Sequence, residues 1–261
     1  MKLKIFQIDA FAEQIFGGNP AAVVPLDSWI SDELMQKIAF ENNLAETVFF
    51  VKNNQEFDIR WFTPTVEVPL CGHATLAAAW VIFNQYNYLE NTIIFQSQSG
   101  KLTVQQLPSG KIELDFPAIS SQPFTEKIPF GDFLGISPIK AFTTSSNLLL
   151  EYGSEEEIIQ VKPDFEKLKQ LEFSGIIITS KGNTTDFVSR FFAPKIGINE
   201  DPATGSAQAS LIPFWSKKLS KTTMTAHQLS ERKGVFEVKL ISDRVKMTGN
   251  AFLFMAGEIY I

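Results

Sequence analysis

Hydrophobic and polar positions alternate along much of this chain, and a period of two residues is typical of half-buried β-strands. Residues 2–10 show the alternation from the start of the chain. Short apolar runs bounded by Gly, Pro, Asn or Ser indicate further strands. We predict strands near residues 2–10, 21–26, 47–51, 56–62, 92–96, 101–106, 111–116, 139–144, 147–152, 175–180, 186–192, 234–241 and 244–248.

Helix starts are indicated by capping residues. Ser31, followed by Asp32 and Glu33, predicts a helix that ends near residues 42–43. The hydroxyl can accept a free N–H of the first turn, and the carboxylates favour the positive end of the helix. A further helix is expected to open at Asp164.

Two Ala-rich segments each follow a turn rich in Gly, Pro and Thr, and each predicts a helix. The first contains the most apolar stretch, residues 74–83, which fits a buried helix. The second begins near Gly205 and contains Pro213. Proline lacks an N–H and its ring clashes with the preceding turn, so we expect it to bend or end that helix near Ile212.

The chain repeats itself once. Residues 56–80 resemble residues 186–211 at an offset of 130 residues, and two later blocks repeat at offsets of 134 and 133. The identical pairs in the first block are Phe57/Phe187, Arg60/Arg190, Phe62/Phe192 and Pro64/Pro194. A single long repeat indicates two similar lobes rather than a many-repeat array. Strand-rich lobes, each with one central helix, define an α+β fold, with the chemistry expected in the cleft between the lobes.

Lobe boundaries follow from the same repeat. Residues 117–138 are rich in Pro, Gly and Ser, and we interpret them as the linker between the lobes. The last segment has no partner left in its own lobe, so we expect it to return to the first lobe. The predicted N-terminal lobe is therefore residues 1–118 with residues 250–261, and the C-terminal lobe is residues 119–249.

Composition excludes several classes of protein. The formal charge is −6 and no basic stripe is present, so nucleic acid is not an expected partner. No apolar run approaches the roughly 20 residues that cross a bilayer, so no membrane association is expected. The N-terminus lacks the features of a signal peptide, and the single cysteine excludes an intrachain disulfide, so we expect a cytoplasmic protein. With two His and one Cys, a structural metal site is not expected.

The two Gly-containing turns are candidate anion-binding sites. Free N–H groups and a partial positive charge at a helix N-terminus favour a carboxylate, so a small anionic substrate is expected. Gly72 and Gly205 would let a ligand approach the backbone, and Thr204 and Ser206 could donate hydrogen bonds to it. The alternative is that these residues serve only as turn and capping residues.

Four other side chains could carry chemistry. Glu46 borders an apolar run, so it is either a desolvated general acid/base or an exposed carboxylate at a strand start. His73 could transfer a proton or cap a helix, and Asp201 could cap a helix or bind a substrate amine or hydroxyl. Cys71 is either the partner of His73 in a nucleophile pair or a buried apolar side chain. The repeated turn has no second Cys, which excludes a symmetric two-thiol racemase.

Four blocks of the sequence together resemble the PhzF-like isomerase family of phenazine biosynthesis. They are DAFAEQIFGGNPAAVV, NLAETVFF, RWFTPTVEVPLCGHATLA and FFAPKIGINEDPATGSA. The resemblance implies a diaminopimelate-epimerase-like fold, with two pseudo-symmetric lobes that are each a barrel-like, mostly antiparallel sheet around a central helix. It also implies cofactor-independent isomerisation and a homodimer. The sequence departs from the family at Lys233, where a turn of the Arg-Gly-Gly kind has glycine.

The same resemblance assigns roles to candidate residues. It implies that Glu46 is the catalytic acid/base and that His73, Asp201 and Ser206 are its partners in substrate binding. One base that moves a proton between two carbons on one face suits an isomerisation. An amino-acid epimerase or racemase, with Asp201 or His73 as second base, is the alternative enzyme. A non-catalytic protein that binds small carboxylates is the alternative outside enzymes.

Overall fold

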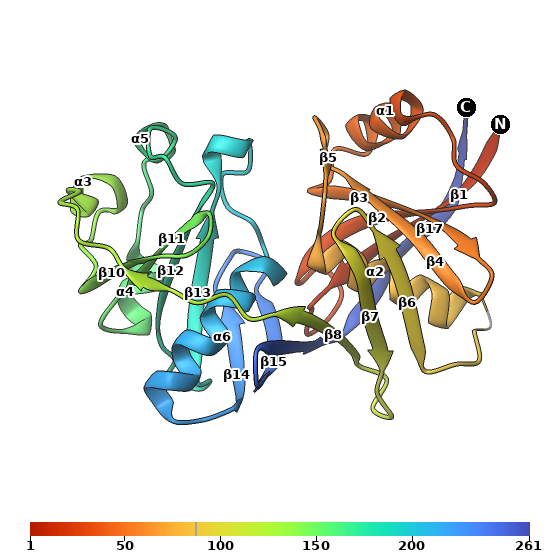
Figure 1. The fold of residues 1–261 in the computed structure, drawn as a ribbon. Coiled ribbons are helices and arrows are strands. Elements are labelled where there is room, and N and C mark those ends of the chain that lie inside the picture. The colour runs from red at the N-terminus through yellow and green to blue at the C-terminus, as the bar shows by residue number, and fades with distance from the viewer. Residues whose placement is uncertain (87) are drawn as a thin grey trace. The chain divides into compact units, whose positions relative to one another are not determined.

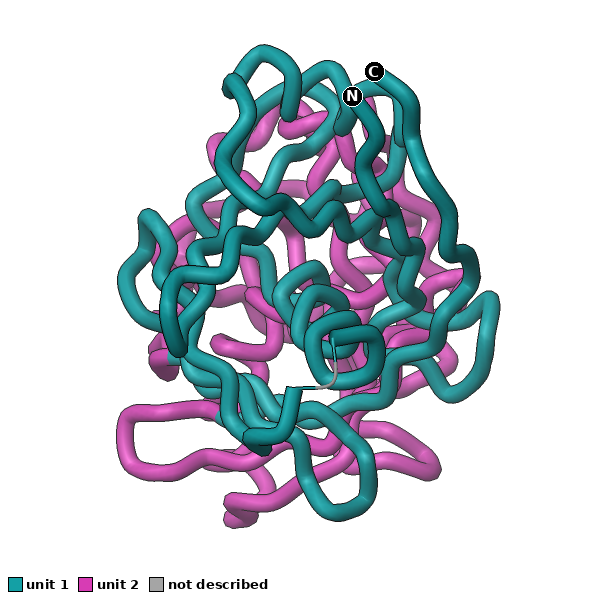
Figure 2. Tube along the Cα trace, turned by 90° about the vertical axis from the view of Figure 1, so that its right-hand side faces the viewer, with its two compact units in different colours: residues 1–116, 246–261 teal, residues 117–245 magenta. Residues whose placement is uncertain are grey.

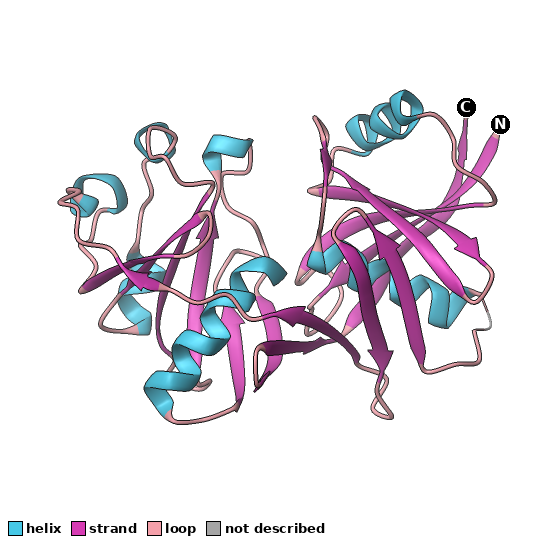
Figure 3. Ribbon diagram, in the orientation of Figure 1, coloured by secondary structure: helices cyan, strands magenta, loops and turns pink. Residues whose placement is uncertain are grey.

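The computed structural model describes residues 1–86 and 88–261, and strands form most of its regular structure (Figures 1 and 3). The chain divides into two compact units, drawn in separate colours in Figure 2. Unit 1 comprises Met1–Phe116 and Lys246–Ile261, and unit 2 comprises Pro117–Val245. In the described part of the chain, no helix is both long enough and apolar enough to cross a membrane.

Unit 1 is built on a continuous series of paired strands. Its elements are β1 (Lys2–Ala10), β2 (Asn19–Leu26), α1 (Asp32–Asn42), β3 (Glu46–Asn53), β4 (Glu56–Phe62), β5 (Glu67–Val68), α2 (Gly72–Gln85), β6 (Thr92–Ser97), β7 (Gly100–Gln106), β8 (Ile112–Pro117), β16 (Arg244–Gly249) and β17 (Ala251–Tyr260). The pairings run β17–β1–β2–β3–β4–β6–β7–β8–β16. The β2–β3 and β4–β6 pairs are parallel, whereas the other pairs with a defined register are antiparallel. The final strand β17 lies beside β1 along its whole length, from Lys2↔Tyr260 to Ala10↔Ala251.

The predicted Ala-rich helix α2 is the centre of unit 1. It packs against β1, β2, β3, β7 and β17, and Figure 2 looks along it, with strands of the same unit around it. Ala74, Ala77 and Ala78 are fully buried. Small side chains let strands approach the helix on several sides, and a helix that is apolar all round must be buried in this way.

Unit 2 has its own core. Its elements are β9 (Gln122–Pro123), α3 (Phe130–Leu134), β10 (Lys140–Thr143), β11 (Asn147–Glu151), α4 (Glu155–Gln160), α5 (Phe165–Leu168), β12 (Gly175–Lys181), β13 (Phe187–Phe192), the short 3₁₀ helix η1 (Pro194–Ile196), α6 (Gly205–Leu219), β14 (Thr223–Gln228) and β15 (Gly234–Ile241). The pairings run β9–β10–β11–β12–β13–β14–β15. Only β11–β12 and β13–β14 in this series are parallel.

The strands of the two units follow the same succession of pairings. The series β2–β3–β4–β6–β7 is parallel, antiparallel, parallel, antiparallel, and so is the series β11–β12–β13–β14–β15. Arg60 of β4 makes a two-pronged contact with Glu67, at 2.7 Å from both Nε and Nη2. Arg190 of β13 makes the same contact with Glu200, at 2.8 and 2.9 Å.

The predicted linker is wrong. Residues 117–138 contain β9 and α3, and the α3 side chains Phe130 and Leu134 belong to the core of unit 2. The many Pro, Gly and Ser residues of this segment indicated a loop, although Phe130 and Leu134 are buried core residues. Other elements were also missed, among them α4 and β14. The three glutamates that open α4 resemble a solvated loop, and β14 is mostly polar with buried Met224 and Ala226.

The predicted break at Pro213 is also wrong, because α6 continues through it to Leu219. Proline removes the N–H that would bond the carbonyl four residues earlier, that of Ala209. In this structure Ala209 O accepts a hydrogen bond from Ile119 N instead, at 2.9 Å. The neighbouring segment thus satisfies the carbonyl that the proline leaves open, and the helix continues.

Candidate active site

Glu46 and His73 form a buried pair in unit 1. Glu46 is the first residue of β3, and His73 is the second residue of α2. Only 9% of Glu46 and 3% of His73 is exposed. His73 Nε2 lies 3.1 Å from Glu46 Oε2. The exposed-carboxylate alternative for Glu46 is therefore wrong for this structure.

The other ring nitrogen of His73 has partners of its own. Cys71 Sγ lies 3.4 Å from His73 Nδ1, and Asn19 Nδ2 lies 3.1 Å from the same nitrogen. Sequence reasoning missed Asn19, because the Gly17-Gly18-Asn19-Pro20 run looks like an ordinary turn. Gly18 has φ +61°, and a Cβ there would lie 2.2 Å from the carbonyl oxygen of Ala10. The glycine therefore lets the chain pass Ala10 and places Asn19 at the start of β2.

The charges of this cluster follow from its burial. Burial disfavours a charged ring, but Cys71 and Glu46 together hold the pKa of His73 well above its usual value. Burial, together with the Glu46 charge, raises the pKa of the Cys71 thiol to about 11. At neutral pH we therefore infer an imidazolium beside a carboxylate, with a neutral thiol. A neutral thiol is a poor nucleophile, which argues against the Cys–His pair as a nucleophile.

The same three side chains form a possible metal-binding group. Donor atoms of Glu46, Cys71 and His73 lie within 4.8 Å of one another. However, Glu46 faces Nε2 of the ring whereas Cys71 faces Nδ1. An ion binds one ring nitrogen only, so it cannot lie between His73 and both partners in this arrangement. The geometry fits a hydrogen-bonded chain better than a coordination sphere.

The predicted turn of unit 2 is organised around Asp201. The hydroxyl of Thr204 donates a short hydrogen bond to the Asp201 carboxylate. Gln228 of β14 accepts from Thr204 N at 2.8 Å and donates to Asp201 O at 2.5 Å. Thr204 is thus engaged within the turn, whereas Ser206, in the first turn of α6, is exposed. Gln228 was missed because its strand was missed.

The structure thus brings the predicted residues together in two sets. Glu46, Gly72 and His73 belong to unit 1. The second set belongs to unit 2 and comprises Asp201, Thr204, Gly205 and Ser206. His227, to which no role was given, lies on β14.

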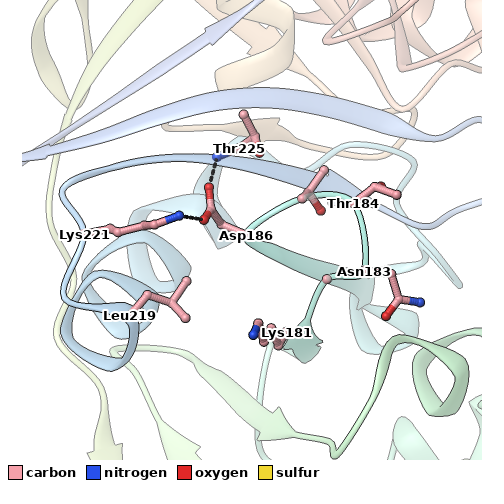
Figure 4. Close-up of a pocket in the computed structure, with 9 residues that line it drawn as sticks. Lys181, Asn183, Thr184, Asp186, Leu219, Lys221 and Thr225 are labelled. Carbon is pink, nitrogen blue, oxygen red and sulfur yellow. Dashed lines mark hydrogen bonds and ion pairs between the residues drawn. The ribbon is translucent and has the colours of Figure 1, made fainter.

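Unit 2 also has an open surface pocket of about 490 Å³, bordered by residues 181–186 and by α6 and β14 (Figure 4). Its carboxylate, Asp186, is already bound by Lys221 Nζ at 2.5 Å and by Thr225 N at 2.9 Å (Figure 4). These contacts satisfy the carboxylate as part of the structure. The pocket offers no buried acid/base pair, so the Glu46–His73 pair remains the candidate active site.

The fold is shared with solved structures that differ widely in sequence identity to this chain. A probable proline racemase from Agrobacterium radiobacter has the same fold, with a TM-score of 0.71 over 99% of this chain and 93% of that one, at 7% identity. A PhzF-family phenazine biosynthesis protein from Enterococcus faecalis is far more similar, with a TM-score of 0.97, 45% identity and complete coverage of both chains. The fold class is therefore the mixed α/β fold of PhzF proteins and epimerases.

The chain belongs to the phenazine biosynthesis-like (PhzC-PhzF) protein family, which it matches over residues 8–257. An uncharacterized isomerase from Pseudomonas aeruginosa is 45% identical over 259 residues, covering 99% of both chains. The protein is accordingly an enzyme of the isomerase type, and the resemblance noted in the sequence is confirmed.

Proposed function

We propose that this enzyme is a cofactor-independent isomerase that moves a proton within a small cyclic or amino carboxylate, with Glu46 as its single general acid/base. The observation that carries the proposal is the buried pair of Glu46 and His73, 3.1 Å apart. The carboxylate group of Glu46 lies out of water beside the imidazolium, and a carboxylate in such a place can accept a proton from carbon. Neither Glu46 Oε2 nor His73 Nε2 has a well-aligned hydrogen bond among the described residues. Such poor alignment is expected of a site that is completed by its substrate.

The proposed mechanism has three parts. Glu46 takes a proton from one carbon of the substrate and returns it to another carbon on the same face. His73 stays protonated and stabilises the carboxylate before the transfer and the substrate charge during it. In unit 2, Ser206 and the N-terminus of α6 suit a carboxylate group, and Asp201, held by Thr204, suits an amine or hydroxyl. Gly72 and Gly205 are proposed to leave room for the substrate near the backbone.

A comparison of the two units supports one base rather than two. We propose that the units derive from an internal duplication, which the shared strand pairings and the two Arg–Glu contacts support. Glu46 then corresponds to Gly175, since each is the first residue of its strand. Each also lies three residues before the residue paired across the sheet with the arginine, Phe49 with Arg60 and Ile178 with Arg190. A Cβ at Gly175 would lie 2.4 Å from Phe191 Cζ. Unit 2 therefore has a glycine in place of a carboxylate, and a larger side chain there would have to displace Phe191, which disfavours a symmetric epimerase.

The test is proton exchange in D₂O, with Glu46→Gln as the matched variant. A library of cyclic and acyclic amino and hydroxy carboxylates is incubated with each protein, and NMR and mass spectrometry follow deuterium uptake and double-bond position. We expect exchange or double-bond movement that Glu46→Gln abolishes, without loss of optical activity at a retained stereocentre.

Other outcomes would replace the proposal. Exchange with racemisation would establish an epimerase. Exchange that persists in Glu46→Gln would move the base to His73 or Asp201. Tight binding of a carboxylate by both proteins, with no exchange, would establish a binding protein.

We also propose a homodimer, for which light scattering on the purified protein should give twice the chain mass of 29.2 kDa.

A further inference from the structure

Cys71 occupies the N-cap position of α2, yet its side chain does not cap the helix. Its backbone is extended, and its carbonyl accepts from Thr75 N at 3.1 Å and from the Thr75 hydroxyl at 2.6 Å. The thiol points instead at His73 Nδ1. Asp, Asn, Ser and Thr are the residues that cap helices well, so a cysteine here is unexplained by the helix alone.

The ring of His73 is held at both nitrogens. Glu46 from β3 faces Nε2, whereas Cys71 from the start of α2 and Asn19 from β2 face Nδ1. Glu46 and Cys71 are the titratable groups that face His73. An imidazolium has two N–H donors, and the sulfur of a neutral thiol or an amide oxygen can accept the one at Nδ1. The atom placed opposite Nδ1 is Asn19 Nδ2. It is a donor, so beside an imidazolium the amide is turned with Oδ1 toward the ring.

We propose that Cys71 is a positioning residue that, together with Asn19, fixes the His73 ring so that its Nε2–H faces the Glu46 carboxylate. The inference rests on the proposed role of Glu46. Cys71 itself does not exchange protons with substrate in this scheme. Its sulfur contacts Nδ1 of the charged ring, and Nε2 of the same ring faces Glu46.

Unit 2 gives independent support. Thr204 is the N-cap residue of α6, and like Cys71 it makes no side-chain cap bond. Its hydroxyl instead donates to Asp201. In both units, therefore, the cap residue before the helix turns its side chain toward a polar side chain of its own unit instead of the helix N-terminus. One such contact could be incidental, but the same use of equivalent positions indicates a function of the cap residue in positioning.

The thiol also suits its place chemically. Burial beside Glu46 keeps it protonated, so it adds no second negative charge that would compete for the imidazolium. A methyl group would leave Nδ1–H with one partner fewer, whereas a hydroxyl could still accept. Cys71→Ala and Cys71→Ser should therefore differ, although the two side chains are of similar size.

The first measurement is the ¹⁵N NMR titration of the histidine rings. The chain has only two histidines, so His227→Gln assigns both sets of signals. We expect the pKa of His73 to fall by about one unit in Cys71→Ala, equivalent to a tenfold weaker preference for the charged ring. In Cys71→Ser it should stay within about 0.3 units of the parent value.

The second measurement is the rate of the exchange reaction identified with the parent protein. Cys71→Ala should lower kcat about tenfold to hundredfold, by analogy with loss of a group that orients a functional histidine, while KM changes less than about threefold. Cys71→Ser should recover most of this loss. Thr75→Val is the structural control, because it removes the hydroxyl bond to Cys71 O and leaves the ring contacts in place. It should lower Tm without moving the His73 titration.

The inference would be overturned by an unchanged His73 titration in Cys71→Ala, or by an equal shift in Thr75→Val. If Cys71→Ala does not fold, Asn19→Ala is measured instead, and an unshifted His73 there overturns the inference as well. The NMR result does not depend on substrate. Absence of any exchange by the parent protein would therefore refute the proposed function. The NMR titration would still show whether Cys71 positions the His73 ring.

Discussion

The Glu46–His73 pair makes a quantitative prediction about stability and pH. Glu46→Gln removes the negative charge beside a buried ring. In the parent protein His73 has a raised pKa, so its stabilising contribution is fully present below about pH 6.5, its unfolded pKa, and is lost as pH rises through the folded pKa. In Glu46→Gln only burial and the neutral thiol remain, so the pKa of His73 should fall below its ordinary value.

The sign and size of the effect follow. Well above the folded pKa of His73, which the ¹⁵N titration gives, the ring is neutral in both proteins, and Glu46→Gln should cost about 1 kcal/mol, the worth of one buried hydrogen bond. At pH 6 the parent keeps the ion pair, whereas the variant buries either an unpaired charge or a ring that must lose its proton. Removing one partner of a buried pair costs about 3–5 kcal/mol. The cost of the substitution should therefore grow by about 2–4 kcal/mol as the pH falls through the folded pKa of His73 to pH 6.

Urea unfolding at the two pH values measures this directly, since the free energy of unfolding follows from the midpoint and slope. A double-mutant cycle with His73→Gln isolates the pair, because the pH dependence should disappear when His73 is absent. A cost of Glu46→Gln that is the same at pH 6 and at a pH well above the folded pKa of His73 would refute the view of the pair as imidazolium and carboxylate.

Two further substitutions test the packing that supports the site. Gly175→Ala should lower the free energy of unfolding by about 1–3 kcal/mol, since the added Cβ meets Phe191 at 2.4 Å. The control is Gly257→Ala, where no atom lies within 4 Å of the added Cβ, and it should change the free energy of unfolding by less than about 0.5 kcal/mol. Equal effects of the two substitutions in thermal or urea unfolding would contradict the view that Phe191 crowds the position of Gly175. Pro213→Ala should stabilise by well under the roughly 3 kcal/mol usual for a helix interior, because Ile119 N already bonds the carbonyl that the proline leaves open. A gain of the full amount in urea unfolding would show that this bond contributes nothing.

Much of the fold could be predicted because the local signals agree with the structure. The cap at Ser31 predicted α1 correctly, since its hydroxyl accepts from Leu34 N at 3.3 Å. Alternation predicted β4, in which Phe57, Ile59 and Trp61 are buried on one face. The failures lie where a distant part of the chain decides the outcome, as in the Ala209 carbonyl bonded by Ile119.

The candidate site could be predicted only in part, for the same reason. Glu46 and His73 were found through motifs, but their contact joins residues 27 positions apart, and no local pattern encodes it. Asn19 contacts His73 across 54 positions, and Gln228 contacts Thr204 across 24. Asparagine and glutamine are common in turns and on strand surfaces, so their types carry no signal of a role. Only the fold shows that Asn19 and Gln228 are buried and contact predicted site residues.

The asymmetry between the units is the feature that the repeat in the sequence conceals. Aligned at Arg60 and Arg190 the two halves differ by 130 residues, yet Glu46 and Gly175 differ by 129 and the helix starts Gly72 and Gly205 by 133, because loop lengths differ. An alignment of the two halves at the arginines therefore does not pair Glu46 with Gly175, whereas the register of the paired strands does. Under the duplication that we propose, Glu46 and Gly175 start equivalent strands, and a carboxylate at only one of them leaves the proposed site with one base. That difference favours proton transfer on a single face of the substrate over inversion, which needs a base on each face.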